Sequence, residues 1–243
     1  MYSKPLFLLV SVIGIVLLVG TNLRSQTASM ALTTAAVATT VQNETPLDSA
    51  LGDLDEDLIP ELVVVYNLPE LKDSFRFFDD EALNFLRKIV IFKQVNSQWE
   101  EWRVYNSCLP GATEGHWAGD PLASLEVVNG ELLMEFVYVG KIYYGGTKEK
   151  YRLRHGDLYL SEFIHEVYSE CADYSIIQID VLNSLATVEE GINNCEDEDM
   201  DKQINHKDIY KVICYPISLM NRNQTMLKVK NVETNEIIEY RQF

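Results

Sequence analysis

Apolar and polar residues alternate over short runs along most of this chain, and short polar turns separate the runs. Alternation with a period of two, rich in β-branched and aromatic residues, is typical of strands with one buried face. The pattern predicts strands at residues 61–67, 88–95, 99–106, 124–128, 132–139, 148–154, 158–168 and 174–182, with weaker ones at 210–215 and 226–230. A short helix is expected at 79–87, which combines an aspartate N-cap with an apolar face.

Two dipeptides, Asn129-Gly130 and His155-Gly156, separate neighbouring predicted strands. Each places glycine where a tight hairpin turn needs a positive φ. No repeat is sustained over three copies, so the sequence does not support a solenoid or a full propeller. We therefore expect a mainly β fold of antiparallel β meanders, arranged as a sandwich or a partly open barrel-like sheet, with one or two short helices.

The first residues have the pattern of an export signal. Lys4 precedes an apolar run at residues 5–20, and Ser29-Met30-Ala31 offers small residues to a signal peptidase. The run is also close to the ~20 residues of a membrane-spanning helix. We expect a signal peptide or N-terminal anchor at 1–31, a flexible linker at 32–50 and a single β-rich domain at 51–243. The protein is then exported, as a periplasmic, secreted or membrane-anchored protein that faces outside.

Acidic residues outnumber basic ones by 37 to 20, which gives a formal net charge of −17. Such a chain repels phosphates, so it is not expected to bind nucleic acid, and membrane contact is expected only through an N-terminal anchor. Divalent cations and basic partners are attracted instead. Four cysteines follow the leader: Cys108, Cys171, Cys195 and Cys214. In an oxidising compartment this even number predicts two disulfide bonds, with three pairings open.

Acidic residues recur at every second position just before the first predicted strand. Read as a coordination loop, the candidate ligands are Asp53, Asp55, Asp57, the Ile59 carbonyl and Glu61. Oxygen ligands gathered by a curled loop suit Ca²⁺. A solvated carboxylate turn is the alternative. The sixth position of the loop is Leu58, where the expected positive φ costs roughly 1–2 kcal/mol.

The acidic loop resembles the DxDxDG loops of FG-GAP/VCBS-type repeats, although Glu56 and Leu58 stand where those loops have glycine or asparagine. A wider pattern resembles a group of exported bacterial proteins. Its motifs here are Gly52 to Glu61, Gly119-Asp120-Pro121, Asn129-Gly130, Gly145-Gly146-Thr147 with Lys150-Tyr151-Arg152, and His155 to Leu160. The first resemblance implies Ca²⁺ as a ligand of the loop, and the second implies export but no activity.

No catalytic motif stands out, because the four histidines form neither HExxH nor HxH. A hydrolase site is conceivable in the glycine-rich segment that holds His116 and Asp120. Four aromatic residues near Gly145-Gly146 are candidates to line a groove for a glycan or a peptide: Phe136, Tyr138, Tyr143 and Tyr144. A second acidic cluster at 196–201 is consecutive rather than spaced, so we expect a solvated turn there.

These observations favour a non-enzymatic extracytoplasmic binding or interaction module, linked to Ca²⁺ through the acidic loop. Its expected partner is an extracytoplasmic protein or a glycan. Two alternatives stay open. One is an exported hydrolase with a site around His116 and Asp120, and the other is a structural or inhibitory protein of the cell envelope.

Overall fold

The structure is a computed structural model that describes residues 46–77, 80–106, 108–111, 115, 119–169, 173–193, 202–213, 216–224 and 226–241. Every described residue belongs to one compact unit, Glu44–Phe243. Most of these residues lie in antiparallel strands, which confirms the mainly β fold. Among the described residues there is no helix long and apolar enough to cross a membrane.

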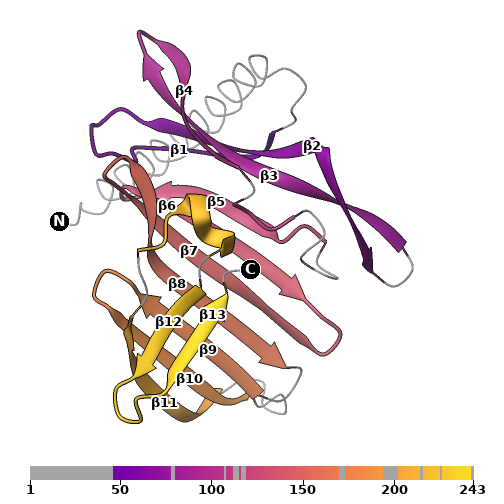
Figure 1. The fold of residues 1–243 in the computed structure, drawn as a ribbon, viewed down its shortest axis with the longest axis vertical. Coiled ribbons are helices and arrows are strands. Elements are labelled where there is room, and N and C mark those ends of the chain that lie inside the picture. The colour runs from indigo at the N-terminus through magenta and orange to yellow at the C-terminus, as the bar shows by residue number, and fades with distance from the viewer. Residues whose placement is uncertain are drawn as a thin grey trace, which may run out of the picture. The chain divides into compact units, whose positions relative to one another are not determined.

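Two antiparallel sheets form this unit (Figure 1). The first has the order β1-β2-β3-β4, with β1 (Pro46–Gly52), β2 (Glu61–Phe77), β3 (Asp80–Val95) and β4 (Gln98–Asn106). The second runs in chain order from β5 at one edge to β13 at the other: β5 (Leu122–Val128), β6 (Glu131–Val139), β7 (Tyr143–Arg154), β8 (Asp157–Ser169), β9 (Asp173–Asp180), β10 (Leu185–Asn193), β11 (Lys202–Val212), β12 (Met226–Asn231) and β13 (Ile237–Arg241). Within each sheet, consecutive strands are neighbours, so both are meanders, and the nine-stranded sheet is strongly curled.

The tight turns follow the predicted chemistry. Asn129 and Gly130 have φ of 53° and 76°, and His155 and Gly156 have φ of 51° and 80°. Two positive φ values in a two-residue loop match the twist of the flanking strands. The same conformation joins β3 to β4 at residues 96–97, with φ of 53° and 65°.

Several segments differ from the expectation, among them β10, β13 and most of β11, which were not predicted as strands. The helix predicted at 79–87 is wrong, because residues 80–87 belong to β3 and pair with β2 from Asn67↔Arg87 to Phe77↔Asp80. Short apolar segments fit either periodicity, and here the partner strand decides. Strand β1 also takes in the last residues of the segment expected to be a linker. The one helix of the described residues is the 3₁₀ helix η1 (Leu219–Gln224), which the pattern did not predict.

The centres of β2 and β3 are buried on both faces, since residues 62–65 and 89–91 have no exposed surface. Strands buried on both faces have continuous apolar runs rather than alternation. One face, with Val63 and Ile91, joins the same hydrophobic core as Met134 of the nine-stranded sheet. The two sheets also meet at Gly52 of β1, where a Cβ atom would lie 2.6 Å from a methyl carbon of Val127 in β5.

Candidate functional site

The acidic loop between β1 and β2 is held together by its own carboxylates. Asp53 accepts hydrogen bonds from the backbone N–H groups of Asp57 (3.1 Å) and Leu58 (2.8 Å). Asp57 accepts another from the N–H of Ile59 at 2.8 Å. Aspartate side chains commonly satisfy backbone groups of a turn in this way. The loop therefore curls as predicted for alternating acidic residues.

Glu61 begins β2, and only 1% of its surface is exposed. One of its oxygens accepts a 2.7 Å hydrogen bond from the N–H of Leu54 at the start of the loop. Burial raises the pKa of Glu61 above its usual value, against the opposing effects of the Leu54 hydrogen bond and the charge of Lys93. A carboxylate this deeply buried requires hydrogen bonds and a positive partner.

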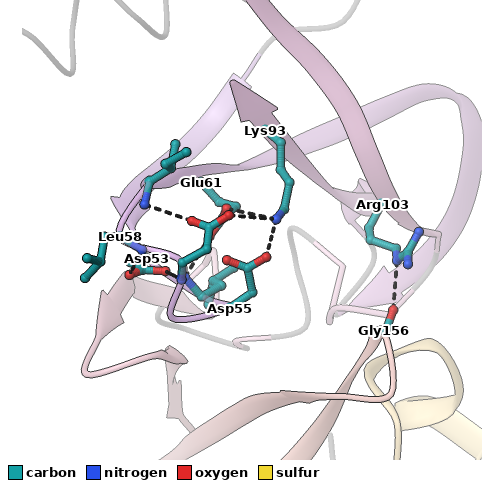
Figure 2. A network of polar contacts seen from close by, with 10 residues as sticks. Asp53, Asp55, Leu58, Glu61, Lys93, Arg103 and Gly156 are labelled. Atoms are coloured by element: carbon teal, nitrogen blue, oxygen red, sulfur yellow. Dashed lines mark hydrogen bonds and ion pairs between the residues drawn. The ribbon is translucent and has the colours of Figure 1, made fainter. Parts of the chain in front are cut away.

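Lys93 of β3 is that partner (Figure 2). Its ammonium is ion-paired with Asp55 and lies 3.5 Å from an oxygen of Glu61 and 3.6 Å from one of Asp57. It also lies 4.2 Å from the centre of the Trp102 ring. Burial lowers the pKa of Lys93, but the hydrogen bond to Asp55 and the neighbouring carboxylates outweigh it, so the pKa is raised. The Lys93 ammonium thus lies at the point where the carboxylates of the loop converge.

The structure gathers three of the four predicted carboxylate ligands of Ca²⁺. Oxygens of Asp53, Asp55 and Glu61 lie within 4.8 Å of one another. Asp57 is not a member of this group. Carboxylate oxygens are the ligands that Ca²⁺ prefers. The donor set therefore fits that ion chemically, but the Lys93 ammonium competes for the same oxygens.

Two residues of the loop have a left-handed backbone. Glu56 has a φ of 62° and Leu58 a φ of 68°, at the fourth and sixth positions of the loop. The Leu58 side chain is 90% exposed, so burial does not offset the backbone strain. The strain expected at the sixth position is therefore present in the structure.

Replacing Leu58 with glycine is expected to raise the free energy of unfolding by about 1 kcal/mol, because glycine adopts positive φ without a Cβ clash. Urea denaturation of both proteins measures the difference. Ile59→Gly is the matched control, since Ile59 is exposed but is not among the residues with positive φ. The control is expected to lose stability. A loss in Leu58→Gly as well would contradict the strain argument.

Asp120, the aspartate of the conceivable hydrolase site, has structural partners. One of its oxygens is ion-paired with Arg87, whose side chain is fully buried. Its other oxygen accepts a 2.9 Å hydrogen bond from the N–H of Leu122. Arg87 also donates to the carbonyl oxygen of Pro110 at 3.2 Å. Both oxygens of Asp120 are engaged, so its described contacts do not favour the hydrolase alternative. His116 lies outside the described residues.

A buried ion pair was missed by the sequence analysis. Arg222 of η1 donates to both oxygens of Glu149 in β7, at 2.8 Å from Nε and 2.7 Å from a terminal nitrogen. Neither side chain has any exposed surface. The Tyr151 hydroxyl donates to Glu149 at 2.8 Å. The alternating pattern of β7 could have indicated that Glu149 is buried, because Glu149 lies between Thr147 and Tyr151 on the buried face of this strand.

The face of the nine-stranded sheet that points away from the core, which we call the outer face, carries a row of tyrosines. Tyr144 of β7, Tyr168 of β8 and Tyr174 of β9 stack with ring centres 5.3 and 6.3 Å apart. Tyr168 donates a 2.9 Å hydrogen bond to Glu166. Tyr144 is 46% exposed. Stacking therefore holds a solvent-exposed aromatic ring in a fixed orientation.

A hollow of about 230 Å³ lies beside this row, over Gly146 of β7. The outer-face side chains that line it come from β6, β7 and β8: Glu135, Val137, Lys148, Ile164 and Glu166. A Cβ atom on Gly146 would lie 2.7 Å from the carbonyl oxygen of Phe136. Backbone packing thus requires glycine here, and the absence of a side chain opens the hollow.

The aromatic groove suggested by the sequence is not assembled as one site. Phe136 is buried, with its ring centre 5.0 Å from the Arg222 guanidinium carbon. Tyr143 and Tyr144 are consecutive in β7, so their side chains point to opposite faces. Tyr143 lines a separate cavity of about 470 Å³ with residues that include Glu190. Of these aromatic residues, Tyr144 is the one that joins the outer-face row.

The expectation of two disulfide bonds is wrong, because it requires all four cysteines and Cys108 is a free thiol. Cys108 is buried, and burial raises the pKa of its thiol to about 12. The other three cysteines lie outside the described residues: Cys171, Cys195 and Cys214. Cys108 therefore behaves as a small core residue.

Two further features, the leader at 1–31 and the acidic cluster at 196–201, also lie outside the described residues. No protein-family model matches the sequence, and no curated protein matches it.

Proposed function

We propose that this chain is a non-enzymatic extracytoplasmic binding module that contacts its partner through the outer face of the nine-stranded sheet. The observation that carries this proposal is the outer-face hollow beside the exposed, stacked ring of Tyr144. Interfaces are enriched in tyrosine, which offers a large contact area at a low entropic cost. A stacked tyrosine has already lost much of its freedom before a partner binds.

Export is supported by the sequence of the leader, with Lys4 before the apolar run at residues 5–20. The resemblance of the acidic loop to FG-GAP/VCBS-type loops remains part of the proposal. In this protein Lys93 supplies positive charge among the carboxylates, so the loop has a structural role and Ca²⁺ is a competitor of Lys93. The hydrolase alternative is not favoured by the described contacts of Asp120.

The proposal is tested with the full chain produced in a bacterial host and recovered from the periplasm. Binding to envelope polysaccharide and to solubilised envelope protein is measured separately by biolayer interferometry. Binding to one of these fractions is expected, and Tyr144→Ala is expected to weaken it severalfold. Tyr159→Ala is the matched control. Tyr159 lies near the start of β8, whereas Tyr168, which stacks on Tyr144, lies near the end of the same strand.

Two results would contradict the proposal. The first is the absence of binding to both fractions. The second is an equal loss of binding in Tyr144→Ala and Tyr159→Ala, which would mean that binding does not depend on the region around the hollow. Failure to recover the chain from the periplasm would contradict the export part alone.

A further inference from the structure

The hollow over Gly146 has a negatively charged rim. Glu135 and Glu166 line it together with a single cation, Lys148. Lys148 is ion-paired with Glu135 at 2.6 Å. Glu166 accepts one hydrogen bond, from Tyr168, and forms no close ion pair within the described part of the chain, although its charge contributes to the raised pKa of Lys148. Glu166 is therefore an oriented carboxylate with charge left to offer a ligand.

The size of the hollow limits what it can hold. At about 230 Å³ it is smaller than the roughly 300–1,000 Å³ of pockets that enclose a small-molecule ligand. Val137 and Ile164 supply apolar walls, and Glu166 supplies a charged end. A long basic side chain is complementary to these walls, because it has an aliphatic stem and a cationic head.

Tyr144 lies close to the hollow along β7, although it is not one of the lining residues. It lies two residues before Gly146 on the same face, so the two positions are about 7 Å apart along the strand. Guanidinium groups stack on tyrosine rings, and arginine does so more often than lysine. The exposed ring of Tyr144 therefore favours arginine as the ligand.

Resting on the proposed function of the outer face, we propose that the hollow over Gly146 binds an arginine side chain of a basic partner polypeptide. Glu166 pairs with the guanidinium, Tyr144 stacks on it, and Val137 and Ile164 contact its stem. The formal net charge of −17 attracts such a partner over a longer range. Glycans lack a positive charge that could form an ion pair with Glu166.

The test is calorimetric titration of the full chain with three probes: a capped tetra-arginine peptide, a capped tetra-glutamate peptide and cellotetraose. Only tetra-arginine is expected to bind, and more weakly at high salt because salt screens charges. Glu166→Gln is expected to weaken binding about tenfold, as for a lost hydrogen bond to a charged group. Tyr144→Ala is expected to weaken it severalfold.

Glu162→Gln is the matched control, because Glu162 lies four residues before Glu166 in the same strand but pairs with Lys150. It is expected to leave binding within twofold. Equal losses in the two variants would mean general attraction by the acidic surface and would overturn the proposal. Binding of cellotetraose that is lost in Tyr144→Ala would also overturn it, in favour of a glycan. Envelope binding without tetra-arginine binding refutes this inference alone, whereas failure of both refutes the proposed function too.

Discussion

Replacing Arg222 with methionine is expected to lower the free energy of unfolding by about 3–5 kcal/mol, the range measured when one partner of a buried ion pair is removed. The pair has no exposed surface, and Glu149 would be left charged inside the core. The Tyr151 hydroxyl donates one hydrogen bond to Glu149, which cannot replace the lost positive charge. Equilibrium urea denaturation of the two proteins measures the loss.

The charge of Glu149 is what makes this loss large, and two variants test that reason. Adding Glu149→Leu to Arg222→Met removes the unpaired charge, so the double variant is expected to recover a large part of the lost stability. Arg152→Met is the surface control, because its pair with Glu131 at 3.4 Å is partly exposed. It is expected to cost less than about 1 kcal/mol. A similar small cost for Arg222→Met would show that η1 is not held by its ion pair.

The strands were predictable where the local sequence determines them. Asn129-Gly130 and His155-Gly156 permit positive φ, so the hairpins they form depend on residues adjacent in the chain. The same holds for the apolar run at residues 62–65, which is buried on both faces. The curl of Asp53 to Glu61 also follows from local side-chain chemistry, and three of the four predicted carboxylate ligands converge.

The missed features depend on pairing between distant segments. Residues 80–87 form a strand because β2 lies beside them, and the local sequence pattern does not show which segment will be the neighbour. Lys93 lies 38 residues from Asp55 in sequence, and the register that pairs Leu62 with Phe92 brings it to the loop. Register cannot be read from one strand alone.

The features of the outer face could not be predicted for the same reason, because they depend on the register of several strands. Tyr144, Tyr168 and Tyr174 come from three strands, and their row exists only because the register aligns them. The hollow depends on a missing side chain at Gly146, whose need for glycine comes from a carbonyl of the neighbouring strand. A sequence pattern predicts strands and turns, but a surface made by several strands requires their alignment.

The acidic loop provides a measurable test of this alignment through Lys93. Lys93→Gln is expected to lower the free energy of unfolding by about 2 kcal/mol, because it removes charged hydrogen bonds from carboxylates that then repel each other. Calcium at millimolar concentration is expected to restore the melting temperature of this variant by replacing the lost cation. The wild-type protein is expected to respond less, because Lys93 occupies the same oxygens.

The decisive comparison is the calcium-induced shift of the melting temperature in three proteins: wild type, Lys93→Gln and Lys150→Gln. Lys150 is ion-paired with one carboxylate, Glu162, so removing it leaves no converging cluster and no calcium response beyond that of wild type is expected. A wild-type shift equal to that of Lys93→Gln would mean that calcium displaces Lys93 without a penalty, and the loop would then be a metal site in its own right. No shift in Lys93→Gln would show that the converging carboxylates do not bind calcium even when the competing cation is gone. The loop would then owe its shape to the hydrogen bonds of Asp53, Asp57 and Glu61 alone.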